Sequence, residues 1–92
     1  MMKRRQTMKL QVIGSNLCED TQDALARLDA KGADYEFVNI TESMDNLSMF
    51  LKIRDTDENY IAVKERGGVG VPYFIFEDGT KTLDPDEALA KL

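Results

Sequence analysis

The stretch that decides the fold is Val12-Ile13-Gly14-Ser15-Asn16-Leu17-Cys18-Glu19-Asp20-Thr21. It continues an alternating apolar run over Lys9–Ile13, which predicts a β-strand. Gly14-Ser15-Asn16 then interrupts that run. Over Cys18–Lys31 the apolar spacing becomes helical, and Gly32 follows, where a helix C-terminal glycine belongs. The stretch therefore predicts a strand, a short loop and a helix that begins at the single cysteine of the chain.

The middle of the chain predicts one more strand and two helices. The alternating run Tyr35–Ile40 completes a β-α-β unit, whose two strands should be parallel. Thr41 or Ser43 can cap a helix that runs to about Arg54. A break and a shorter helix to about Arg66 follow. The residues expected to be buried are Met44, Leu47, Phe50 and Leu51 in the first helix, and Tyr60, Ile61 and Val63 in the second.

The last part of the chain predicts a hairpin and a final helix. Tyr73–Phe76 is an apolar strand, and Glu77–Thr80 is a turn that leads into a short return strand, Lys81–Leu83. Asp84-Pro85 starts a helix, with aspartate as N-cap and proline at the first helical position. The order β-α-β-α-α-β-β-α predicts an α/β fold, with a four-stranded mixed sheet flanked by helices.

The amino-acid composition of the chain excludes several classes of function. The chain has 92 residues, one cysteine and no histidine, which excludes an internal disulfide framework, a Cys/His zinc cluster and Ser-His-Asp catalysis. Its net charge of −5 argues against nucleic-acid binding. No stretch has the length of a membrane span, so no membrane association is expected. A free thiol survives in a reducing compartment, which predicts a cytoplasmic location.

The N-terminal segment is expected to lie outside the domain. Lys3-Arg4-Arg5 forms a basic cluster that no apolar run follows, so it does not predict a secretory signal. We interpret residues 1–7 as a solvated tail and residues 8–92 as one domain.

Three features can carry chemistry. Cys18 opens a helix, whose first backbone N–H groups lack partners and favour a thiolate over a thiol. Val71-Pro72 stands at the entrance of an apolar strand, where the backbone of Val71 could pair with an extended ligand. Thr82-Leu83-Asp84-Pro85 is another strand-to-helix junction, whose N–H groups could hold a carboxylate. Each feature also has a purely structural interpretation, as a buried cysteine, an edge proline and a helix cap.

Taken together, Val12–Thr21, Tyr35–Thr41 and Gly70-Val71-Pro72 resemble the glutaredoxins, and within them short bacterial glutaredoxin-related proteins. The resemblance extends from about Met8 to Leu92. It implies a thioredoxin-like fold and a cis peptide before Pro72. It also implies a thiol-disulfide oxidoreductase that acts on glutathionylated proteins or small disulfides, with glutathione as co-substrate. We expect the chain to be a monomer.

The resemblance assigns roles to individual residues. Cys18 would be the attacking thiol. The backbone of Val71 would hold the cysteinyl part of glutathione, and Leu83 and Asp84 its γ-glutamyl end. Asn16 stands near the place where many members use a lysine for a glutathione carboxylate. The glutathione-binding residues predicted in this way are Asn16, Val71, Pro72, Leu83 and Asp84.

The chain departs from the family pattern beside the cysteine. Thr21 stands where dithiol members have a second cysteine, so only a monothiol route is open. Glu19 and Asp20 place negative charge next to the sulfur and oppose the effect of the helix terminus. Two alternatives therefore stay open. Cys18 of two subunits, with two glutathiones, could bridge an iron–sulfur cluster, which would make Cys18 a metal ligand. The chain could also be a binding module that keeps the fold without the chemistry.

Overall fold

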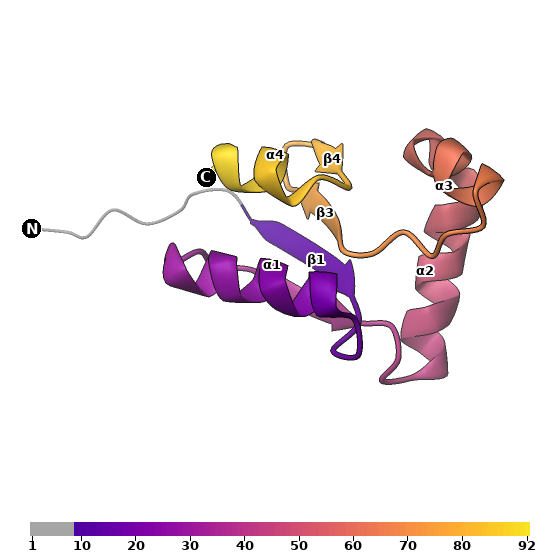
Figure 1. Cartoon of the computed structure of the whole chain (residues 1–92), viewed down its shortest axis with the longest axis horizontal. Coiled ribbons are helices and arrows are strands. Elements are labelled where there is room, and N and C mark those ends of the chain that lie inside the picture. The colour runs from indigo at the N-terminus through magenta and orange to yellow at the C-terminus, as the bar shows by residue number, and fades with distance from the viewer. Residues whose placement is uncertain (1–8) are drawn as a thin grey trace, which may run out of the picture.

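The computed structural model describes residues 9–92, and Figure 1 shows how their helices and strands are arranged. The predicted tail, residues 1–7, lies outside the described residues. The elements are β1 (Leu10–Gly14), α1 (Glu19–Ala30), β2 (Glu36–Asn39), α2 (Met44–Thr56), a 3-10 turn η1 (Glu58–Tyr60), α3 (Ile61–Glu65), β3 (Tyr73–Phe76), β4 (Lys81–Thr82) and α4 (Pro85–Ala90). This is the predicted order, with the third predicted helix, the one that ends at about Arg66, divided into η1 and α3.

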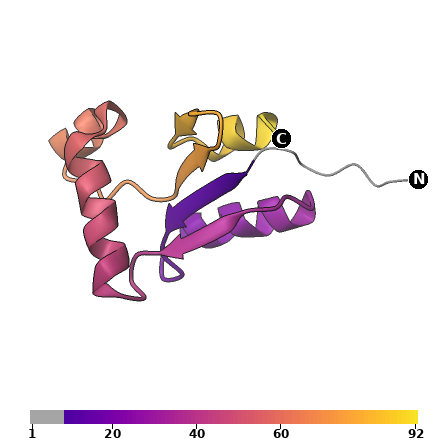
Figure 2. The ribbon, with the colours of Figure 1, turned by 180° about the vertical axis from the view of Figure 1, so that it is seen from behind.

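The four strands form one mixed sheet in the order β2-β1-β3-β4. β1 is parallel to β2, with Gly14 opposite Asn39, and antiparallel to β3, with Ile13 opposite Tyr73. β3 and β4 are antiparallel. The predicted α/β class and the predicted strand directions are confirmed. The carboxyl ends of β1 and β2 therefore meet the start of β3 at one end of the sheet (Figure 2).

Two apolar clusters form the core. The first joins α1 and α4 to one face of the sheet; its buried members are Leu10, Val12, Ala24, Leu28, Phe74, Phe76 and Ala88. The second lies where α2, η1 and α3 meet the other face, near the end of β1 (Figure 1); its buried members are Ile13, Ile40, Phe50, Tyr60, Val63 and Tyr73. Burial of this apolar area is the main stabilising contribution to a small domain.

Two predicted core positions in α2 and one in α3 are wrong. Met44 and Leu51 are 74% and 43% exposed. The inward side of α2 instead follows Leu47, Phe50 and Ile53, so a residue such as Leu51 turns away by roughly a third of a turn. Ile61 is 56% exposed because Tyr60 and Val63, three residues apart, share the inward face.

Within residues 9–92, none of the helices has both the length and the apolar character needed to cross a bilayer.

Candidate functional site

Cys18 occupies the N-cap position of α1. Its backbone is extended, with φ −101° and ψ 123°, and its side chain makes no capping hydrogen bond. The Cys18 N–H donates to Ser15 O at 3.0 Å, and its carbonyl accepts the N–H of Gln22 at 3.0 Å. The residue is half-buried rather than part of either core cluster. Cys18 therefore stands at the start of a helix, as the sequence predicts, and the residue is partly exposed.

Thr21 is a packing residue beneath the loop. It is fully buried, and its Oγ1 accepts the N–H of Ser15 at 3.4 Å. Gly14 permits this close approach, because a Cβ at Gly14 would lie 2.6 Å from Thr21 Oγ1. The position that would hold a resolving cysteine in a dithiol protein is thus occupied by a hydroxyl that fixes the start of the loop.

Polar side chains from the end of β2 hold the loop before Cys18. Ser15 Oγ lies 2.8 Å from Thr41 Oγ1, and the N–H of Leu17 donates to Ser15 Oγ at 3.1 Å. Asn39 Nδ2 donates to Asn16 Oδ1 at 3.1 Å. Asn16, predicted to bind glutathione, is therefore exposed but engaged in a structural contact. The sequence analysis missed the roles of Asn39 and Thr41, although two polar residues at the end of a predicted strand were the available signal.

The segment before β3 lies at the same end of the sheet. The Val71–Pro72 peptide is cis, as the resemblance implies, and Pro72 is buried. Tyr73 pairs with Ile13, the residue before Gly14 at the end of β1. This register brings Pro72 and the loop of Cys18 to one end of the sheet.

The loop that leads to Val71 is fixed by its carbonyl groups. Arg54 Nη2 donates to Gly68 O at 2.5 Å, and Tyr60 Oη donates to Gly70 O at 2.6 Å. By contrast, within residues 9–92 the N–H and carbonyl of Val71 take part in no loop, turn or side-chain hydrogen bond. The backbone of Val71 is consequently the part of this segment that is available to a ligand.

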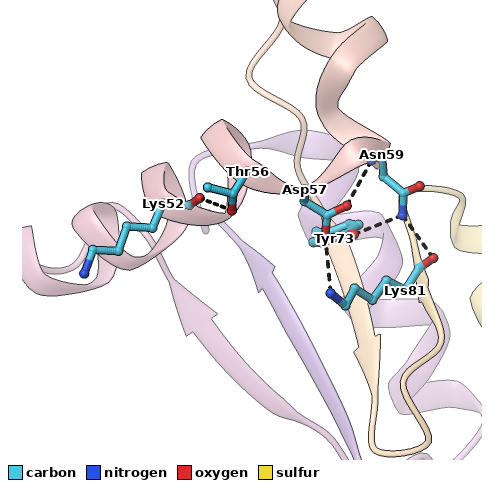
Figure 3. A network of polar contacts seen from close by, with 6 residues as sticks. All are labelled: Lys52, Thr56, Asp57, Asn59, Tyr73 and Lys81. Atoms are coloured by element: carbon cyan, nitrogen blue, oxygen red, sulfur yellow. Dashed lines mark hydrogen bonds and ion pairs between the residues drawn. The ribbon is translucent and has the colours of Figure 1, made fainter.

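Tyr73 is held by a polar network that the sequence analysis did not anticipate (Figure 3). Its hydroxyl donates to Asp57 Oδ2 at 2.6 Å and accepts from Asn59 Nδ2 at 3.0 Å. Lys81 Nζ lies 3.7 Å from Asp57 Oδ2. Burial acts to raise the pKa of Asp57, but the hydrogen bonds from Tyr73 and from Asn59 N–H, with the charge of Lys81, lower it overall. Burial and the contact with Asp57 raise the pKa of Tyr73 to about 12.

The predicted glutathione-binding junction at Leu83 and Asp84 is a helix cap in the structure. Asp84 Oδ1 accepts the N–H of Asp86 at 3.0 Å, and the N–H of Asp84 donates to Thr82 Oγ1 at 3.0 Å. Leu83 is half-buried and packs against the same cluster as Val71. The structure thus brings Leu83 and Val71 to one core cluster, whereas the carboxylate of Asp84 caps the N-terminus of α4.

Two open pockets lie elsewhere. One, of about 550 Å³, lies at the opposite end of the sheet, where β1 begins and β3 ends; it is lined by Lys9, Leu10, Gln11, Asp34, Tyr35, Glu36, Ile75, Phe76 and Glu77. The other, of about 490 Å³, lies beside the Tyr73 network; it is lined by Thr56, Asp57, Glu58, Asn59, Gly79 and Lys81. Neither of these two pockets is lined by Cys18.

The chain is similar to a protein of known sequence. An uncharacterized protein of Haemophilus influenzae is 36% identical over 67 residues, which cover 73% of this chain and 78% of that protein. No family model matches the chain. No solved structure matches it.

Proposed function

We propose that this chain, which belongs to the same family as the uncharacterized Haemophilus influenzae protein, catalyses glutathione-dependent thiol-disulfide exchange by a monothiol route. Cys18 is the attacking thiol, and glutathionylated proteins or small disulfides are the substrates. The proposal also assigns the chain to the cytoplasm, where the glutathione pool keeps thiols reduced.

The observation that carries the proposal is the position of Cys18. It is the N-cap residue of the 12-residue helix α1, without a side-chain capping bond and with partial exposure. The first N–H groups of a helix lack internal partners and stabilise negative charge placed beside them. A thiolate is the reactive form in disulfide exchange, so this is a suitable place for a nucleophilic sulfur.

The two exchange steps of this cycle need glutathione as their only co-substrate. The Cys18 thiolate attacks one sulfur of a glutathionyl mixed disulfide; the new S–S bond joins Cys18 to glutathione, and the released thiolate takes a proton from water. A second glutathione thiolate then attacks the Cys18 mixed disulfide, which forms glutathione disulfide and restores Cys18. Thr21 offers no second sulfur, so the cycle needs one free glutathione in addition to the glutathionyl group that the substrate carries.

We further propose that the α/β fold is thioredoxin-like. Support comes from the order β2-β1-β3-β4, with one parallel and two antiparallel pairs. The apolar contacts of α1 and α4 on one face of the sheet and of α2 and α3 on the other agree with this proposal.

Glutathione would bind mainly through backbone groups. The unpaired N–H and carbonyl of Val71 suit an extended peptide that adds like a strand beside Pro72. The side chains of Asn16 and Asp84 already make contacts within the protein, so we assign them weaker roles than the resemblance implies. Leu83 contributes apolar contact.

The test is glutathionylation of the reduced full chain by glutathione disulfide, followed by mass spectrometry. We expect the mass to rise by one glutathionyl group in the wild type and to stay constant in Cys18→Ser. Added glutathione should reverse the change. Thr21→Ser keeps the hydroxyl beside the loop and serves as the matched control, which should react like the wild type. A wild-type chain whose mass does not change under glutathione disulfide would exclude the proposed function and leave a binding module.

A further inference from the structure

We propose that Ser15 and Thr41 are positioning residues for Cys18, and that their hydroxyl groups form one directed chain of hydrogen bonds. The two oxygens lie 2.8 Å apart, and either could be the donor from that distance alone. The neighbours of each hydroxyl decide the direction. The direction of this hydrogen bond shows which hydroxyl group links the loop before Cys18 to the end of β2.

Asn39 fixes the direction at one end of the chain. Its Oδ1 lies 2.9 Å from Thr41 Oγ1 and accepts the N–H groups of Thr41 and Asn16 at 3.2 and 3.4 Å. An amide oxygen only accepts, so the single hydroxyl hydrogen of Thr41 points to Asn39. A longer contact of 3.3 Å to Asn16 Oδ1 competes for the same hydrogen and leads to the same conclusion.

Ser15 must then donate to Thr41, since the hydrogen of Thr41 is already used. Its oxygen remains free to accept, and the N–H of Leu17 donates to it at 3.1 Å. The chain therefore runs from Leu17 N–H through Ser15 and Thr41 to Asn39. Consecutive hydrogen bonds of one direction polarise and strengthen one another.

This chain of hydrogen bonds begins at Leu17, one residue before Cys18. Ser15 is only 5% exposed, and its carbonyl accepts the N–H of Cys18 at 3.0 Å. Thr41 lies 26 residues further along the sequence, two residues after the end of β2. The sheet, and not only α1, thus holds Cys18 in its extended N-cap conformation. If the loop loosens, Cys18 spends less time in its position at the start of α1, where the first amides of the helix face outward.

The variant Thr41→Val removes the central hydroxyl and keeps the shape of the side chain. Thr41→Ser keeps the hydroxyl and should rescue the wild-type behaviour. Thr56→Val is the matched control, because Thr56 Oγ1 donates to Lys52 O at 2.7 Å in an exposed part of α2. Ser15→Ala breaks the same chain from the other side, so the test does not depend on one substitution.

Two measurements on the reduced full chain test the proposal. One is amide hydrogen exchange of Leu17 by NMR. The other is alkylation of Cys18 by iodoacetamide at pH 7, in which sulfur bonds to carbon, iodide leaves and the thiol proton passes to water. In Thr41→Val and Ser15→Ala we expect Leu17 to exchange about fivefold faster, and alkylation to be roughly two- to fivefold slower, as the loss of one net hydrogen bond implies. Thr41→Ser and Thr56→Val should match the wild type.

Unchanged Leu17 exchange or unchanged alkylation in Thr41→Val would overturn the proposal, and so would equal effects in Thr56→Val. The effect of Ser15 and Thr41 on catalysis rests on the proposed function, whereas their effect on the position of Cys18 does not. If the wild type takes up no glutathione but the four variants behave as expected, the proposed function fails and the positioning chain stands. If glutathione is transferred equally fast by the wild type and Thr41→Val, the positioning role fails alone.

Discussion

The hydroxyl of Tyr73 donates to Asp57 Oδ2 at 2.6 Å, which ties the first residue of β3 to the turn between α2 and η1. The side chain of Asp57 is only 10% exposed, so water cannot fully replace a lost partner. The ring of Tyr73 also packs edge-on against Tyr60, with centroids 4.9 Å apart. The residue that follows Pro72 is therefore fixed by both polar and apolar contacts.

The first prediction is that Tyr73→Phe destabilises the protein, by about 1–3 kcal/mol, because a half-buried carboxylate loses its shortest donor. Tyr35→Phe is the matched control: Tyr35 donates to Asp29 Oδ1 at 2.8 Å, but in an exposed contact. The control should cost less than about 0.5 kcal/mol. Urea unfolding followed by circular dichroism measures both, and equal losses would contradict a special role for the Asp57 contact.

The second prediction concerns acid pH. The pKa of Asp57 is lowered in the folded chain, so its charged form is bound more favourably there than in the unfolded chain. That stability is present above the unfolded value of about 4 and is lost as pH falls through the lower folded value. Asp78 acts in the same direction, with its pKa lowered to about 2 by the N–H of Thr80 and by Lys91.

The free energy of unfolding should therefore fall as pH is lowered from about 5 to 2. Asp57→Asn should be less stable at pH 7 and should lose less on acidification. Asp55→Asn, an exposed neighbour in α2, should keep the wild-type slope. Urea unfolding at several pH values measures these slopes. A wild-type slope in Asp57→Asn would show that other carboxylates cause the acid sensitivity.

The sequence predicted the elements that local signals define. Tyr73–Phe76 is found as predicted, because a continuous apolar run needs no information from elsewhere. Asp84 caps α4 with Pro85 at the first turn, since that signal is contained in consecutive residues. The same holds for the place of Cys18 at the start of α1.

The sequence could not predict what depends on pairing across the fold. Ser15 and Thr41 are 26 residues apart, and Asp57 and Tyr73 are 16 residues apart. Their contacts follow from sheet register and helix placement, which no local pattern specifies. The same reason explains the exposure of Met44, since the side of α2 that faces inward is set by how Phe50 packs into the second apolar cluster.

The third prediction is that Gly70→Ala is strongly destabilising. Gly70 has φ +87°, and an added Cβ would collide with the ring of Tyr60. The backbone strain alone costs about 1 kcal/mol, and the collision with a buried ring adds to it. Gly79→Ala is the control, because Gly79 has φ +94° with no atom within 4 Å of an added Cβ.

Thermal unfolding should therefore show a much larger loss for Gly70→Ala than for Gly79→Ala. The same substitution should slow glutathionylation of Cys18, because the displaced segment leads directly into Val71. Similar melting temperatures in the two variants would mean that the ring of Tyr60 moves aside easily and does not fix this loop.

The last prediction concerns the position that a resolving cysteine would occupy. Thr21 is the third residue of α1 and Cys18 its N-cap, so their Cα atoms lie about 5–6 Å apart, within the range that a disulfide spans. In Thr21→Cys, the introduced thiol should attack the Cys18–glutathione mixed disulfide, release glutathione and leave an internal disulfide. Mass spectrometry after treatment with glutathione disulfide should then find no stable glutathionyl adduct and two hydrogens fewer than in the reduced chain. A persistent adduct would show that a thiol at this buried position cannot reach the sulfur of Cys18. The burial of position 21, and not only the missing second thiol, would then prevent dithiol chemistry in this fold.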